Sequence, residues 1–286
     1  MEVDNIILEK IIENALIEDI GPSDITTDNI FVDTNNIETA QITAKDKGVL
    51  AGGFVVKKVF DLIDQNIIVD LKLSDGQEFE PGTLIASIEG RTDKILKGER
   101  TALNFVQRLS GIATKTREMV NLASPYGVKI LDTRKTTPTL RYLEKYAVRA
   151  GGGINHRMGL YDGVMIKDNH KKAAGSIKNA LEKLKSNLGP MVKICVEATN
   201  KEEAEEAYYN GADQILLDNM SPEVISEIVK KIGDEDKRAE NKIVKFEVSG
   251  NIGESDIKAL AKTGIDFISS GKITHSYNSI DFSLNF

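Results

Sequence analysis

Cysteine is nearly absent from this sequence, and long hydrophobic runs are missing. The chain of 286 residues has one cysteine, Cys195, so no internal disulfide can form and a reducing compartment is expected. Cys195 lies in an apolar run, where a small buried side chain is its expected role. No apolar run approaches the roughly 20 residues that a membrane span needs. The first residues, MEVDNIILEKII, carry acids where an export signal would carry Lys or Arg. We therefore expect a cytoplasmic protein that does not cross a membrane.

An excess of positive charge is also missing. The formal net charge is −7, whereas a nucleic-acid-binding protein would carry a basic footprint. One segment departs from this balance, because residues 130–172 hold nine Lys and Arg against four Asp and Glu. A positive segment within an acidic chain indicates a site for a small polyanion, and no nucleic acid partner is expected.

Sequence motifs of nucleotide-binding loops are missing too. The chain has no Walker-type phosphate loop, and the run Gly151–Gly153 lacks the spacing of a dinucleotide-binding motif and a strand before it. We expect this glycine run to form a tight turn that brings the backbone near the substrate.

What is present divides into two parts. Residues 1 to about 90 predict a small α/β domain, with a helix over 5–16 and short strands or strand–helix pieces over 38–45, 49–59, 67–73 and 83–88. Residues 95–123 predict one long helix with a kink at Ser110–Gly111.

The rest of the chain alternates apolar runs with helical patterns. Helix starts are expected at Asn200 and Ser221, and helix ends just before Gly211, Gly233 and Gly264. Such alternation predicts a parallel sheet that forms a barrel or near-barrel. The predicted strands are 128–131, 163–166, 192–196, 214–217, 243–248 and 265–269.

Each predicted strand ends in polar residues, which would converge on one mouth of a barrel. Cationic ends would bind carboxylates and phosphates, and acidic ends would hold Mg²⁺ or sugar hydroxyls. The late Ser-Gly segments offer backbone N–H groups to a phosphate. Asp168 has a second interpretation as the partner of a neighbouring Lys, and His170 as a turn residue. The strand ends are Arg134-Lys135, Lys167-Asp168, Glu197, Asp218-Asn219, Glu247 with Ser249-Gly250-Asn251, and Ser269-Ser270-Gly271.

Several segments along the whole chain resemble the quinolinate phosphoribosyltransferase (decarboxylating) family of NAD biosynthesis. They are EDIGPSDITT (18–27), ERTALNFVQRLSGIAT (99–114), DTRKTTP (132–138), EKYAVRAGGGINHRMGLYDGVMIKDNH (144–170), LLDNM (216–220), EVSGNI (247–252) and ISSGKITHS (268–276). The resemblance implies a type II phosphoribosyltransferase fold, in which an N-terminal α/β sandwich domain joins an incomplete α/β barrel. The implied boundaries are 1–107 with 276–286 for the sandwich domain and 108–275 for the barrel. The resemblance also implies a homodimer.

The same resemblance implies roles for individual residues. Arg134, His156, Arg157 and Lys167 would hold the two quinolinate carboxylates, with Arg100 reaching in from the neighbouring subunit and Thr133 also in the substrate site. Lys135, Glu197 and Asp218 would be catalytic and would handle phosphoribosyl pyrophosphate with its Mg²⁺, directly or through the pyrophosphate. The 5′-phosphate would lie against Ser249, Gly250, Asn251, Ser270 and Gly271, with His275 close by.

Departures from the family pattern are few, and other chemistries compete with it. Pro22-Ser23, Thr139 and Asn251 stand where the family often has glycine. A paralogous family linked to molybdenum uptake shares the fold, but the full cationic set argues against it. An aldolase that forms a Schiff base at Lys167 and a polyanion-binding protein without activity are the remaining alternatives.

Overall fold

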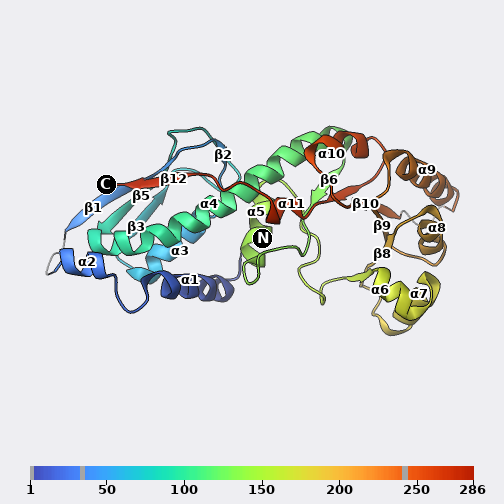
Figure 1. Ribbon diagram of the computed structural model, residues 1–286, viewed down its shortest axis with the longest axis horizontal. Coiled ribbons are helices and arrows are strands. Elements are labelled where there is room, and N and C mark those ends of the chain that lie inside the picture. The colour runs from blue at the N-terminus through green and yellow to red at the C-terminus, as the bar shows by residue number, and fades with distance from the viewer. Residues whose placement is uncertain (1–2, 33–35, 240–243) are drawn as a thin grey trace. The chain divides into compact units, whose positions relative to one another are not determined.

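The computed structural model describes residues 3–32, 36–239 and 244–286 (Figure 1). It divides into two compact units that are each assembled from separate stretches of chain. The first contains Met1–Arg117, Thr136–Gly153 and Ile273–Phe286, and the second contains Glu118–Lys135 and Ile154–Lys272. The domain boundaries that the family resemblance implies stay a prediction.

The first unit is built on an antiparallel sheet with the order β12-β1-β5-β3. The β1 strand alternates exposed and buried residues, so one face of the sheet packs into the core. The C-terminal β12 strand pairs with β1, which places the last residues beside the first strand. The strands are β1 (Ile37–Ala44), β3 (Ile68–Leu71), β5 (Leu84–Arg91) and β12 (Phe282–Asn285), with the small pair β2 (Gly48–Val49) and β4 (Glu78–Phe79).

Helices supply the other layer of this unit. The α3 helix buries Val55, Val56, Val59 and Phe60 on one face and contacts β3, and α1 packs on α3. The α4 helix approaches α3 so closely that a Cβ on Gly98 would lie 2.6 Å from the Phe60 ring. The helices are α1 (Asn5–Ile20), α2 (Ile25–Ile30), α3 (Gly53–Ile63), α4 (Thr92–Ala123), α5 (Arg141–Ala150) and α11 (Lys272–His275).

The predicted elements of this part are confirmed, and the predicted kink at Ser110–Gly111 stays a prediction. The 49–59 segment is a strand–helix piece, β2 followed by α3, and α4 runs through Ser110 and Gly111 without interruption. A Cβ on Gly111 would lie 2.3 Å from the carbonyl oxygen of Asn278, so this glycine permits close backbone approach. Gly151–Gly153 forms a turn, and a Cβ on Gly151 would lie 2.4 Å from the carbonyl oxygen of Ala113. That turn therefore serves helix packing against α4.

The second unit is a parallel sheet with the order β6-β11-β10-β9-β8-β7, and all six predicted strands are confirmed, although residue 243 of the predicted strand 243–248 lies outside the described residues. Among the described residues, β6 and β7 do not pair with each other, so the sheet is an incomplete barrel. The β8 strand, between β9 and β7, is buried at every residue, as expected for a strand covered on both faces. The strands are β6 (Lys129–Leu131), β7 (Val164–Ile166), β8 (Ile194–Ala198), β9 (Gln214–Asp218), β10 (Lys245–Ser249) and β11 (Phe267–Ser269).

Helices connect these strands, and α7, α8 and α9 follow one another beside β8 and β9 (Figure 1). The predicted helix start at Asn200 is confirmed, since its side chain accepts a hydrogen bond from the Glu203 N–H at 2.8 Å. The predicted helix end at Gly233 is wrong. The α9 helix continues to Ala239, because a mostly helix-forming sequence without proline follows this single glycine. The helices are η1 (Ser124–Tyr126), α6 (Asp168–Ala174), α7 (Ile177–Asn187), α8 (Lys201–Tyr209), α9 (Pro222–Ala239) and α10 (Glu254–Ala261).

Candidate active site

The polar strand ends of the second unit lie at one edge of its sheet. The strands are parallel, so their carboxyl ends point the same way and their last residues are neighbours. Most of the predicted site residues belong to this edge: Thr133, Arg134 and Lys135 after β6, Lys167 after β7, Glu197 in β8, Asp218 in β9, Ser249, Gly250 and Asn251 after β10, and Ser270 and Gly271 after β11.

A buried carboxylate joins two cationic segments of this edge. Asp132, fully buried at the end of β6, accepts hydrogen bonds from the Asn155 side-chain amide at 2.6 Å and from the His156 backbone N–H at 2.9 Å. A parallel bridge between Leu131 and Ile154 holds the same two segments together. The segments that carry Arg134 and Arg157 are thereby fixed side by side. Sequence reasoning missed Asp132 as a site residue, although it begins the DTRK cluster.

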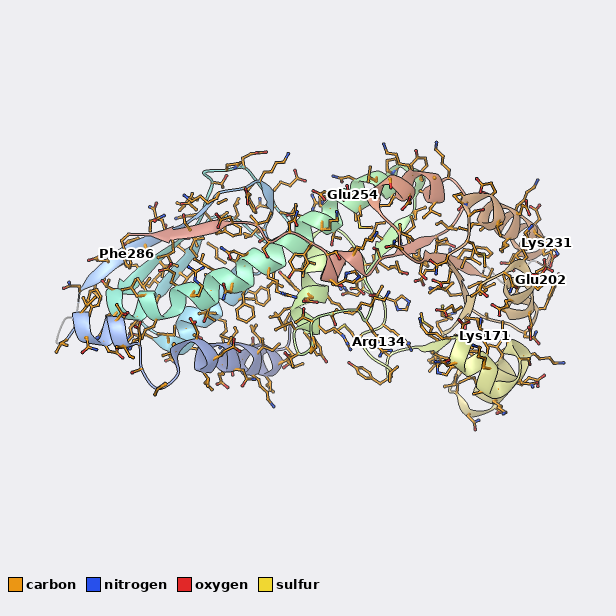
Figure 2. All side chains as sticks on the ribbon, in the orientation of Figure 1. Arg134, Lys171, Glu202, Lys231, Glu254 and Phe286 are labelled. Carbon is orange, nitrogen blue, oxygen red and sulfur yellow. The ribbon has the colours of Figure 1, made fainter. Side chains whose placement is uncertain are left out.

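Two arginine side chains at this junction, Arg134 and Arg157, are near enough for their charges to interact. Burial lowers the pKa of Arg157, and the nearby positive charge of Arg134 lowers this pKa further. One guanidinium nitrogen of Arg157 donates to the Gly163 carbonyl at 2.8 Å, which fixes the side chain. Arg134 is exposed on the segment after β6 and is labelled in Figure 2. Repulsion between two neighbouring cations is relieved when an anion lies between them, as expected for a carboxylate-binding site.

The β7 and β8 ends form a linked ion-pair network. Lys167 Nζ lies 2.9 Å from Glu197 Oε2, and buried Lys171 (Figure 2) contacts the Glu197 carbonyl at 3.2 Å. Lys171 also pairs with Asp168 and with Glu203, each at 2.8 Å. Burial lowers the pKa of Lys171, but the hydrogen bonds to the two carboxylates outweigh burial and hold this pKa above its ordinary value. Asp168 therefore takes the predicted alternative role of pairing with a neighbouring Lys.

His170 lies in the same region and serves the backbone. Its Nδ1 accepts a hydrogen bond from the Lys167 N–H at 3.1 Å, at the first turn of α6. This contact agrees with the turn-residue interpretation of His170. It also orients the backbone from which the Lys167 side chain extends.

The β9 and β10 ends hold Asp218 rigidly. Its two carboxylate oxygens accept from the Ser249 hydroxyl and from the Asn219 amide, each at 2.7 Å. Asn219 adopts φ 53°, and a Cβ on Gly250, whose φ is 136°, would lie 2.5 Å from the Asn219 side-chain oxygen. The left-handed region favours asparagine and glycine, which explains both residue types here. The sequence indicated Asn219 as a polar strand end, but not its contact with Asp218.

The two predicted phosphate segments are joined by a lysine that sequence reasoning missed. Lys272 Nζ contacts the Asn251 carbonyl at 3.2 Å, and the Lys272 N–H donates to the Ser270 hydroxyl at 3.3 Å. The Ser270 N–H donates to the Leu131 carbonyl at 3.1 Å. Segments 249–251 and 270–271 thus lie together at the edge of the sheet, with a positive charge between them.

Arg100 and His275 belong to the first unit. Arg100 is exposed on α4, and within residues 3–32, 36–239 and 244–286 its side chain has no hydrogen bond or ion pair. His275 is exposed, and its Nδ1 lies 2.7 Å from the Ser276 hydroxyl. Neither residue is brought to the sheet edge by the fold of the second unit itself.

Glu197 and Asp218 are the candidate magnesium ligands. In the part of the chain that the structure describes, no group of three or more His, Cys, Asp or Glu side chains could enclose a metal ion. Mg²⁺ in proteins usually keeps several waters and takes one or two carboxylates together with substrate phosphates. Two carboxylates on neighbouring strands fit a metal ion of this kind.

The described helices include none that is long and apolar enough to span a membrane.

Cys195 is buried in β8, as expected, and burial followed by the charges of Glu247 and Glu197 raises the pKa of its thiol. This thiol therefore stays protonated, in agreement with its predicted role as a small core residue.

Comparison with known proteins identifies relatives over nearly the whole chain. The family models of the quinolinate phosphoribosyl transferase N-terminal and C-terminal domains match residues 24–110 and 112–285. A "Probable nicotinate-nucleotide pyrophosphorylase (carboxylating)" of Bacillus subtilis (strain 168) is 44% identical over 278 residues, which cover 97% of this chain and 93% of that protein.

Solved structures agree with these matches. The nicotinate-nucleotide pyrophosphorylase of Francisella tularensis superimposes with a TM-score of 0.91 at 41% identity, over 99% of this chain and 97% of the other. NadC of Streptococcus pyogenes superimposes with a TM-score of 0.93 at 38% identity, over 100% and 98% of the two chains. The chain therefore belongs to the quinolinate phosphoribosyltransferase family.

Proposed function

We propose that the residues at the carboxyl edge of the six-stranded sheet carry out the reaction of this family. The chain transfers phosphoribosyl from phosphoribosyl pyrophosphate to quinolinate and forms nicotinate mononucleotide, pyrophosphate and CO₂, a step of NAD biosynthesis. The single observation that supports the assignment of the site is the pair of interacting cations, Arg134 and Arg157, whose chain segments are joined by the buried Asp132.

Quinolinate binds through its two carboxylates. Arg134, Arg157 and Lys167 supply the positive charge, and His156 belongs to the same group of residues. Arginine binds a carboxylate through two parallel hydrogen bonds, whereas lysine acts as a compact charge. Together they orient the ring so that its nitrogen faces C1 of the ribose.

Charge explains the order of bond changes. Breaking the bond between C1 and the pyrophosphate oxygen leaves an oxocarbenium-like centre, which the pyridine nitrogen attacks. Lys135 stabilises the negative charge of the leaving pyrophosphate, and Glu197 and Asp218 place negative charge near C1 and bind ribose hydroxyls. The alkylated ring is an electron sink, so the bond to the 2-carboxylate breaks, CO₂ leaves, and the ring carbon takes up a proton.

The phosphate and the metal ion bind beside these residues. The backbone N–H groups of segments 249–251 and 270–271 hold the 5′-phosphate, and Thr133 contacts the substrate. Glu197 and Asp218 would hold Mg²⁺, directly or through the pyrophosphate. When bound, the ion neutralises charge on the pyrophosphate.

We also propose that the protein acts as a homodimer in the cytoplasm. Arg100 is an exposed cation for which the described part of its own chain supplies no partner, as expected of a side chain that serves the site of a second copy. The acidic net charge of −7 is unfavourable for binding nucleic acid.

One assay tests the function and the metal together. Purified protein is mixed with quinolinate, phosphoribosyl pyrophosphate and Mg²⁺, and CO₂ and nicotinate mononucleotide are measured. We expect both products in equal amounts, and no turnover in excess chelator. Binding of phosphoribosyl pyrophosphate without release of pyrophosphate would instead indicate a polyanion-binding protein without activity. Undiminished turnover in chelator would refute the role of the metal.

Substrate selectivity tests the cationic site. Nicotinate has one carboxylate, so at least one partly desolvated cation would be left unpaired, at a cost of roughly 2–5 kcal/mol. At about 1.4 kcal/mol per tenfold, kcat/KM for nicotinate should fall at least 30-fold below the value for quinolinate. Phthalate keeps both carboxylates but lacks the attacking nitrogen, so it should compete with quinolinate and never react. Equal efficiency with nicotinate would show that the cations serve another anion.

A further inference from the structure

Glu247 is a buried carboxylate of the sheet to which the proposed reaction assigns no role. It lies on β10 with no solvent exposure. In the parallel register Glu247 pairs with Leu216 of β9, and so does Glu197 of β8. Side chains at registered positions point to the same face of a sheet. Glu247 therefore points to the same face of the sheet as Glu197 and lies at the same level along the strands.

The contacts of Glu247 are few for a carboxylate without solvent. One oxygen, Oε2, accepts a hydrogen bond from the Gln214 side-chain amide and lies 3.4 Å from His156 Nε2. The other oxygen, Oε1, has no hydrogen-bond partner in the described part of the chain. Burying a carboxylate is unfavourable unless a donor or cation compensates it, so an apolar side chain would serve the core better. The contact with His156 explains why a carboxylate occupies this position.

His156 has a contact at each ring nitrogen: a hydrogen bond at Nδ1 and, among the described residues, only a 3.4 Å charge contact at Nε2. Its Nδ1 accepts a hydrogen bond from the Arg157 backbone N–H at 2.7 Å, so the ring proton resides on Nε2. Nε2–H in turn faces the Glu247 carboxylate. The ring therefore connects a buried carboxylate to the backbone of an arginine, and its backbone N–H is fixed separately by Asp132.

We propose that Glu247 is a positioning residue for the quinolinate-carboxylate site, acting through His156 on the backbone of Arg157. This inference rests on the proposed role of Arg157 as a carboxylate ligand. The carboxylate fixes the tautomer and plane of the His156 ring. The ring in turn fixes the backbone of Arg157, from which the guanidinium side chain extends. Carboxylates that orient metal-ligating histidines act in the same way. His156 contributes to substrate binding by orienting Arg157.

The first test is spectroscopic and does not depend on activity. The chain has three histidines, His156, His170 and His275, so ¹⁵N-histidine labelling gives three imidazole signals that single His→Gln variants assign. We expect the Nε2–H tautomer for His156, and a shift of its signals alone in Glu247→Gln. An Nδ1–H tautomer or an imidazolium in the wild-type protein at neutral pH would overturn the proposal, whether or not the variant folds.

The second test separates positioning from simple stabilisation. Glu247→Gln should raise KM for quinolinate about 10- to 100-fold, the loss typical when a carboxylate behind a histidine is removed. KM for phosphoribosyl pyrophosphate should change little. Glu247→Asp, which keeps the charge but shortens its reach, should also raise KM for quinolinate. Equal changes in both KM values, or none, would contradict the proposal.

A matched control is available in α9. Asp236 is also buried with one oxygen, Oδ1, without a hydrogen-bond partner among the described residues, and its Oδ2 accepts from the Val244 N–H at 2.7 Å. Asp236→Asn should leave both KM values unchanged. If the wild-type protein has no activity with quinolinate, the proposed function fails, while the His156 tautomer still decides the link to Glu247.

Discussion

Arg134 and Arg157 are two neighbouring positive charges that repel each other, and a bound anion would reduce this repulsion. Burial and the charge of Arg134 both lower the pKa of Arg157, so the free site stores electrostatic repulsion. Asp132, two residues before Arg134, accepts hydrogen bonds from Asn155 and His156 and so ties the Arg134 segment to the Arg157 segment. Binding of a dicarboxylate relieves the repulsion, and this gain is largest where solvent screens least.

Arg134→Lys tests the bidentate contact. Lysine keeps the charge but cannot form two parallel hydrogen bonds, and a lost charge-assisted bond is worth roughly 1.5–3 kcal/mol. We expect kcat/KM for quinolinate to fall about 10- to 100-fold in steady-state kinetics. The control is Arg91→Lys in the first unit, which removes an equivalent fork to Asp93, with contacts of 3.0 and 3.1 Å, and should leave kinetics unchanged. Wild-type kinetics in Arg134→Lys would exclude the bidentate role.

Gly250→Ala tests the phosphate segment. The residue has φ 136°, and a Cβ would lie 2.5 Å from the Asn219 oxygen, so the turn after β10 and the contact of Asn219 with Asp218 must shift. Such backbone strain costs roughly 1–3 kcal/mol, and we expect KM for phosphoribosyl pyrophosphate to rise about tenfold. The control Gly189→Ala has no atom within 4 Å of the new Cβ and should behave as wild type. An unchanged KM would remove segment 249–251 from the site.

At the residue scale the sequence predicted which side chains carry charge at the strand ends, but not how they are supported. Asp132, Glu247 and Lys272 were missed as supporting residues because their partners lie far away in the chain. Thr139 has φ 69°, in the left-handed region that residues other than glycine seldom adopt, and its sequence position alone does not reveal this. The pattern of residues along the sequence specifies the type of each side chain, but not which distant residue it contacts.

At the scale of elements, a buried ion pair joins α4 to α5 within the first unit. The fully buried Glu144 accepts from Arg108 Nε at 3.1 Å and from the Thr137 N–H at 3.0 Å. The Arg108 guanidinium also lies over the Tyr277 ring, 5.3 Å from its centroid. This one carboxylate therefore ties the long helix to the turn before α5.

Glu144→Ala should destabilise the fold and leave an uncompensated charge. A fully buried pair loses about 3–5 kcal/mol when one partner is removed, and the partial exposure of Arg108 reduces this to about 2–3 kcal/mol. The free energy of unfolding from urea titration measures the loss. Glu202→Ala on the exposed face of α8 (Figure 2) is the control and should change stability by less than about 0.5 kcal/mol. Equal stability of the two variants would contradict a structural role for the pair.

At the scale of the whole molecule, the proposed dimer makes a prediction about shared sites. Arg100→Ala and Lys135→Ala should each be inactive, because each removes a cation from every site. In a hybrid dimer one site contains Lys135 from one subunit and Arg100 from the other, and this site is intact. Random exchange makes half of the dimers hybrid with one intact site each, so about one quarter of wild-type activity should return. No recovery, after exchange is shown with labelled subunits, would place Arg100 outside a shared site.

The sequence by itself determined the alternation of strands and helices, the parallel sheet and the charge of its edge. These follow from local periodicity and from the common direction of parallel strands, which brings strand ends such as Glu197 and Asp218 together. The tertiary structure alone decided that His156 lies between Glu247 and Arg157, and that α9 runs through Gly233. The contact of His156 depends on how distant segments are placed in three dimensions. The length of α9 depends on the sum of many small helix preferences. Neither produces a repeating pattern in the sequence.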